Sequence, residues 1–220
     1  MSTGWTVHFM NARGALDPFV DPLRRALDEV ARRVAPLVPP IALDVQVEAA
    51  ATQGIPEYGH SGYAPRPGLV RLTLYPENPN LADSLGEPLE RMIAHELHHA
   101  LRWDAVGYGT TLLGALASEG LAGRFVHELY ANAHEPWERP PAPDALRSWA
   151  AEAARGAGDA RYDHDRWFFG AAELPKHAGY KLGYAMVEAH ERLVGTVPSA
   201  MVATPAESFE TALASLATEY

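Results

Sequence analysis

The sequence His-Glu-Leu-His-His at residues 95–99 constrains this chain more than any other feature. It lies within a pattern that predicts a helix from Ser84 to Trp103. Because residues four apart lie on the same face of a helix, His95 and His99 can offer two imidazole nitrogens to one ion. Glu96 is next to His95, close enough to act on a water molecule bound to that ion. The stretch therefore predicts a metal-binding helix with a carboxylate beside the metal.

The composition limits both the metal chemistry and the partners. The chain has no cysteine, so His, Asp or Glu must hold any metal. The formal net charge of −10 argues against nucleic acid as a partner, because phosphate binding needs clustered Lys and Arg. No stretch approaches the roughly 20 apolar residues that span a bilayer, and no secretory signal is visible at the N-terminus. We therefore expect a cytoplasmic protein with no membrane partner.

Hydrophobic periodicity predicts strands followed mainly by helices. Alternating apolar residues predict three strands, at residues 5–10, 41–49 and 69–75. The Gly- and Pro-rich residues 54–68 predict a loop or a wide hairpin. Apolar residues at helical spacing predict helices at residues 17–34, 84–103, 110–129, 144–154, 176–194 and 205–216. We expect Asp17 to cap the first helix, and Ser84 with Glu87 to form a capping box on the central one.

This order of elements predicts an α+β fold, and the length suits a single domain over residues 1–220. Residues 1–82 are expected to form a strand-rich half with a small mixed sheet. Residues 83–220 are expected to form a mostly helical half that carries the metal site. Strand 69–75, just before the central helix, is expected to be an edge strand that can pair with an extended substrate.

A catalytic zinc site usually has three protein ligands and a water molecule. The metzincin arrangement is excluded, because Arg102 and Ala105 occupy the positions of its Gly and third His. Glu119, 20 residues after His99, is our preferred third ligand. Two antiparallel helices joined by a Gly-containing turn can bring it over the two histidines. We rank four other candidate ligands lower: Asp104, His127, Glu128 and His134.

The spacing to Glu119 and its Ser-Glu-Gly context resemble the gluzincins, the thermolysin-like superfamily, whose third ligand is such a Glu. Four segments then occur in a fixed order: His-Glu-Leu-His-His-Ala-Leu-Arg (95–102), Ser-Glu-Gly-Leu-Ala (118–122), Arg-Trp-Phe-Phe-Gly (166–170) and Leu-Pro-Lys-His-Ala-Gly-Tyr-Lys-Leu-Gly-Tyr (174–184). Together they resemble a bacterial family of predicted zinc-dependent proteases, a domain of unknown function, over roughly residues 65–215. The resemblance implies a zincin-like metalloprotease fold, a zinc cofactor and peptidase activity.

One position departs from the thermolysin-like pattern. Those enzymes place an Asp four residues after the ligand Glu, where it orients a zinc-bound His, and this chain has Gly123 there. Metal-bound histidines nearly always donate their other ring N–H to a partner. Asp104, Glu128 or a backbone carbonyl could serve, and the sequence does not choose between them.

The expected reaction is hydrolysis of a peptide or protein substrate. Glu96 would act as general base on zinc-bound water and then return the proton to the leaving amine. Three residues are candidate donors to the developing oxyanion, His177, Tyr180 and Tyr184, and of these Tyr184 is expected to pack in the core instead. Two alternatives stay open at this point: a zincin scaffold that binds a partner without turnover, and a hydrolase of a non-peptide amide.

Overall fold

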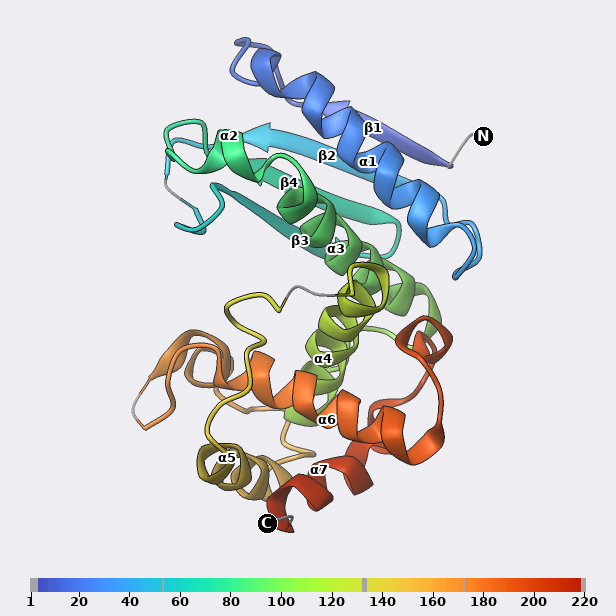
Figure 1. The fold of residues 1–220 in the computed structure, drawn as a ribbon, viewed down its shortest axis with the longest axis vertical. Helices are drawn as coiled ribbons and strands as arrows, with labels where there is room; N and C mark the ends of the chain where they lie inside the picture. Colours follow the sequence, from blue (N-terminus) through green and yellow to red (C-terminus); the bar gives the residue numbers. More distant parts are fainter. Residues whose placement is uncertain (1–3, 53, 132–133, 172, 219–220) are drawn as a thin grey trace. The chain divides into compact units, whose positions relative to one another are not determined.

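The computed structural model describes residues 4–52, 54–131, 134–171 and 173–218. The chain folds into two compact units, residues 1–104 and 105–220, and Figure 1 shows the strands in the first and the later helices in the second. An α+β fold with a mixed sheet is confirmed. The expectation of a single zincin-like domain over residues 1–220 stays a prediction.

The first unit contains one four-stranded sheet in the order β1-β2-β4-β3. Its strands are β1 (Trp5–Phe9), β2 (Leu43–Ala49), β3 (His60–Arg66) and β4 (Leu69–Leu74). The pairs β1–β2 and β2–β4 are parallel, and β3–β4 is antiparallel. The three predicted strands are therefore present with small changes at their ends.

The prediction that strand 69–75 lies at an edge is wrong. β4 lies between β2 and β3, so the edge strand on this side is β3, inside the segment expected to be a loop or wide hairpin. The sequence of β3 does not alternate clearly, because Gly62 and Pro65 interrupt its apolar residues. Backbone pairing to β4 builds the strand instead, with an irregularity between Tyr63 and Arg66.

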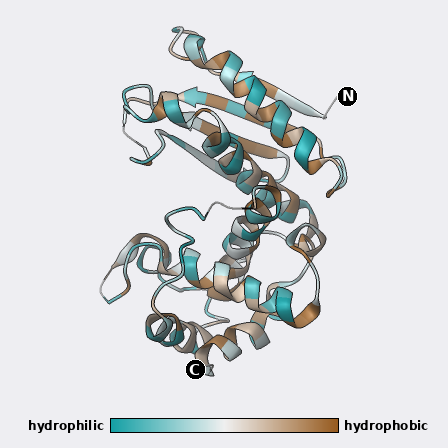
Figure 2. Ribbon diagram, in the orientation of Figure 1, coloured by the Kyte–Doolittle hydropathy of each residue, from teal (hydrophilic) through white to brown (hydrophobic). Residues whose placement is uncertain are grey.

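Four helical segments complete the first unit: a 3-10 turn (Asp17–Phe19), α1 (Val20–Val34), α2 (Leu81–Ser84) and α3 (Glu87–Ala105). Burial alternates along β2, with Val45 and Val47 buried, so one face of the sheet is covered. α1 and α3 lie over the sheet in Figure 1, and Figure 2 shows hydrophilic and hydrophobic residues alternating along α1. The amphipathic pattern of residues 17–34 thus predicted the buried side of α1 correctly.

Both predicted helix caps in this unit are wrong. Asp17 begins the 3-10 turn, and its carboxylate accepts a hydrogen bond from the Asn11 side chain at 2.7 Å. Ser84 ends α2, and its hydroxyl donates to the backbone carbonyls of Tyr58 and Leu81. Because a buried hydroxyl needs an acceptor, those carbonyls hold Ser84 inside the unit rather than at the start of α3.

All the secondary-structure elements described in the second unit are helices or helical turns. These are α4 (Leu112–Leu129), α5 (Pro143–Arg155), a π-helical turn (Arg166–Gly170), α6 (Ala178–Val194), two 3-10 turns (Pro198–Met201 and Ala206–Phe209) and α7 (Glu210–Thr218). The four helices predicted here are confirmed, with α4 starting after Thr111, whose hydroxyl accepts a bond from the Gly114 N–H.

α4 and α6 cross with their backbones in close contact. A Cβ on Gly120 would lie 2.1 Å from the carbonyl oxygen of Gly183, and a Cβ on Gly183 would lie 2.4 Å from that of Leu116. Side chains at either position would push the helices apart, so both glycines are needed for this packing. The glycines of the Ser-Glu-Gly and Leu-Gly-Tyr segments therefore have a structural role.

Candidate metal centre

Two histidines of α3 point their ring nitrogens at one position. The Nε2 atoms of His95 and His99 are 3.0 Å apart, and their rings meet edge to face with centroids 4.7 Å apart. His99 is buried and His95 is half-buried. The predicted spacing on one helix face is thus confirmed for the pair.

This separation suits a shared metal ion. Two Zn–N bonds of about 2.0–2.1 Å at a tetrahedral angle place the nitrogens about 3.3 Å apart. The distance of 3.0 Å between the two Nε2 atoms is close to that value. The pair therefore fits zinc in both donor type and geometry.

Glu96 lies against the edge strand of the sheet. Glu96 is 7% exposed, and a Cβ on Gly62 of β3 would lie 2.4 Å from the Glu96 Cγ. One further contact fixes β3 to α3, because the Trp103 indole N–H donates to the Ala64 carbonyl at 2.8 Å. The predicted general base therefore occupies a space that exists only because residue 62 has no side chain.

Glu119 belongs to the second unit, on the third turn of α4, and is 8% exposed. The Tyr108 hydroxyl donates a hydrogen bond to its Oε1. Ser118 fixes this tyrosine in turn, since its Oγ donates to the Tyr108 carbonyl at 2.5 Å. Burial and then the negative charge of Glu119 raise the pKa of the Tyr162 phenol.

A buried carboxylate fills the space beside Gly123. Glu138 is 3% exposed, and a Cβ on Gly123 would lie 2.6 Å from its Oε1. The Oε2 of Glu138 accepts a hydrogen bond from the Glu135 N–H at 3.0 Å. A residue from a distant loop thus places an acid next to α4, one helical turn after Glu119, where the chain has no side chain of its own.

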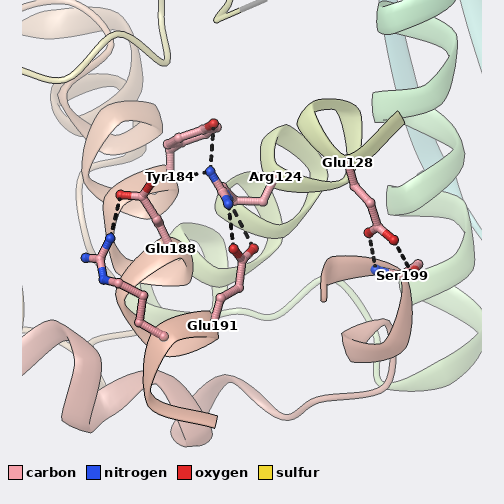
Figure 3. Close-up of polar contacts among 7 residues, drawn as sticks. Arg124, Glu128, Tyr184, Glu188, Glu191 and Ser199 are labelled. Atoms are coloured by element: carbon pink, nitrogen blue, oxygen red, sulfur yellow. Dashed lines mark hydrogen bonds and ion pairs between the residues drawn. The ribbon is translucent and has the colours of Figure 1, made fainter. Parts of the chain in front are cut away.

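The three predicted oxyanion donors lie on or next to α6, in different surroundings. Tyr184 is buried, its hydroxyl accepts a bond from Arg124 at 3.0 Å, and Arg124 also binds Glu191, as Figure 3 shows. Burial raises the pKa of the Tyr184 phenol. These contacts favour the packing role expected for this residue.

His177 and Tyr180 are half-buried neighbours, with ring centroids 5.9 Å apart. His177 has a φ of 71°, and among the described residues it is the one non-glycine with positive φ. Such a backbone costs of order 1 kcal/mol and often marks functional positions. Its ring also meets Trp137 edge to face, with centroids 6.0 Å apart.

The lower-ranked ligands are engaged elsewhere or exposed. Glu128 accepts bonds from the N–H and hydroxyl of Ser199, at 2.9 and 2.7 Å (Figure 3). His127 and His134 stack on each other with centroids 5.3 Å apart. Burial and then the positive charge of Arg124 lower the pKa of His127. Asp104 is exposed.

Comparison with known proteins places the chain in a family. Residues 25–211 match the family model described as "Predicted Zn-dependent protease (DUF2268)". The chain belongs to this family. No curated protein and no solved structure matches the chain.

In this member of the predicted Zn-dependent proteases, the contacts of Tyr108, Glu138 and Gly62 were not predicted from the sequence. Tyr108 stands between Gly107 and Gly109, whose φ values of 78° and 96° mark a tight turn, and that pattern was a usable signal. Nothing near Glu138 or Gly62 in the sequence indicated their neighbours.

Among the described residues, no helix combines the length and the hydropathy that a membrane span requires.

Proposed function

We propose that this chain is a gluzincin-type zinc peptidase, in which His95, His99 and Glu119 hold one zinc ion and Glu96 is the general base. The convergence of the two Nε2 atoms, 3.0 Å apart beside a buried carboxylate, is the observation that carries the proposal. The membership of a family described as predicted zinc-dependent proteases agrees with it.

The donor set also supports the proposal. The proposed ligands are two imidazoles, His95 and His99, and one carboxylate, Glu119. Two neutral imidazoles and one carboxylate are ligands that catalytic zinc uses, and three protein ligands leave a position open for water. Glu96 supplies a general base, which a purely structural metal site would not need.

In the proposed reaction, zinc would polarise the peptide carbonyl and lower the pKa of water toward neutrality. Glu96 accepts a proton from that water and later delivers it to the nitrogen of the leaving amine. Its low exposure keeps bulk water away from the carboxylate, which strengthens its interaction with the reacting groups. Its placement against Gly62 limits the positions that it can adopt.

The proposed substrate is an extended peptide that pairs with β3. This strand is the sheet edge that lies against Glu96, so a segment added to it runs beside the general base. Main-chain hydrogen bonds along an edge strand bind a peptide independently of its sequence. Tyr63, the residue after Gly62, is 62% exposed and can contact substrate side chains.

His177 and Tyr180 are the proposed donors to the oxyanion that forms on the peptide carbonyl. Preorganised donors of this kind are commonly worth a factor of about 10²–10³ in kcat. The strained backbone of His177 supports a role beyond packing. Tyr184, engaged with Arg124, is left out of this assignment.

The test is a comparison of Glu96→Gln with the native protein. Zinc content and the cleavage of a proteome-derived peptide library are measured for both. The proposal predicts one zinc per chain in both proteins and peptide cleavage only in the native one. Cleavage that survives Glu96→Gln would refute Glu96 as the base. Zinc without any peptide cleavage in the native protein would favour a binding scaffold, or a hydrolase of another amide.

A further inference from the structure

Glu119 is 8% exposed, and burying a carboxylate costs free energy unless it is hydrogen-bonded. The Tyr108 hydroxyl supplies a hydrogen bond to Oε1. A phenol hydroxyl has one hydrogen to donate, and it brings no positive charge to the carboxylate. An Arg or Lys partner would instead place a positive charge beside Glu119.

The position of Tyr108 is set by the same short segment that carries Glu119. The buried Ser118 hydroxyl donates to the Tyr108 carbonyl at 2.5 Å. The turn also packs closely on α4, because a Cβ on Gly109 would lie 2.8 Å from the Gly114 Cα. Two adjacent residues thus bind one tyrosine: Ser118 bonds to the backbone of Tyr108, and Glu119 bonds to its side chain.

We propose that Tyr108 is a positioning residue for the metal ligand Glu119, and that Ser118 holds Tyr108 in place. The inference rests on the function proposed above. Ligating carboxylates are themselves hydrogen-bonded, and losing such a partner typically costs about 10–100-fold in metal affinity. A carboxylate held through Oε1 by Tyr108 has its orientation fixed before the metal binds. Ser118 then helps to orient Glu119 indirectly, because it fixes the backbone of Tyr108, whose hydroxyl binds the Glu119 carboxylate.

The experiment measures zinc affinity by competition with a chromogenic chelator, for the native protein and three variants of the full chain. Tyr108→Phe removes one hydroxyl and is expected to weaken zinc binding about 10–100-fold. Ser118→Ala is expected to weaken it in the same direction and by less. Tyr162→Phe is the matched control, because the charge of Glu119 acts on Tyr162 but the Tyr162 hydroxyl bonds to His164 at 2.9 Å. Its zinc affinity is expected to stay within about twofold of native.

A double-mutant cycle separates this role from a purely structural one. If Tyr108 acts through Glu119, Tyr108→Phe weakens zinc binding in the native chain but changes it less than about twofold when Glu119→Gln is present. Equal losses in both backgrounds would overturn the inference. So would native affinity in Tyr108→Phe, or in Ser118→Ala if Tyr108→Phe does not fold. Native protein that binds no zinc would instead refute the proposed function itself.

Discussion

Gly62 of β3 and Glu96 of α3 are in direct contact, and a Cβ on Gly62 would lie 2.4 Å from the Glu96 Cγ and 2.4 Å from the Met92 Sδ. The edge strand and the proposed general base therefore share one tightly packed space. A side chain at residue 62 must displace Glu96, Met92 or β3 itself.

Gly62→Ala is expected to slow hydrolysis about 10–100-fold, because a shift of about 1 Å in a catalytic group has an effect of this size. Zinc affinity should change by less than about threefold, since His95 and His99 are untouched. Gly86→Ala is the control, because a Cβ there meets nothing within 4 Å. Steady-state kinetics with zinc titration measures both quantities, and unchanged kcat/KM in Gly62→Ala would contradict the contact.

Gly123→Asp is expected to destabilise the protein by about 2–4 kcal/mol, because the new carboxylate meets the buried Glu138. Adding Glu138→Ala should restore part of the lost stability, since it removes both the overlap and the like charge. Gly156→Asp is the matched control, with open space around its Cβ. Urea denaturation of the single and double variants gives the coupling. Additive losses would show that Glu138 does not occupy this space.

His60 makes stability depend on pH. Burial, together with the positive charge of Arg91, lowers its pKa to about 4 from the usual 6.5, although an interaction with the Ser84 backbone opposes the shift. The unfolded chain therefore binds more protons at this residue between pH 6.5 and 4, and stability falls as pH falls through that window. The total loss from His60 is about 3 kcal/mol.

His60→Phe should flatten this dependence, because phenylalanine can keep the stacking on Tyr58 and has no proton to bind. Urea denaturation between pH 4 and 7 measures the slope. His8→Phe, at an exposed position, should retain the native slope. A slope that persists unchanged in His60→Phe would mean that other groups, such as His127 and His190, account for it.

Local patterns predicted the parts of the fold that depend on neighbours close in sequence. The spacing of His95 and His99 predicted their convergence because helix geometry alone sets it. The alternation around Val45 and Val47 predicted β2 because one face of the sheet is covered. The strand β3 was missed because backbone pairing, not side-chain alternation, maintains it through Gly62.

Contacts between distant residues could not be read from the sequence. The Ser84 hydroxyl bonds to the carbonyl of Tyr58, which a capping-box pattern cannot reveal. Glu138 reaches Gly123 from a separate loop, so no local pattern in the sequence indicates an acid beside α4. The bond from Tyr108 to Glu119 depends on a turn whose glycines are visible but whose direction is not.

The most direct test of the central claim is the zinc stoichiometry of the purified chain, measured by elemental analysis for the native protein and for His99→Ala, Glu119→Ala and the control His127→Ala. We predict one zinc per chain in the native protein and in His127→Ala, and less than about a tenth of that in His99→Ala and Glu119→Ala under chelator competition. A native protein without zinc, or full zinc binding by Glu119→Ala, would contradict the proposed three-ligand site.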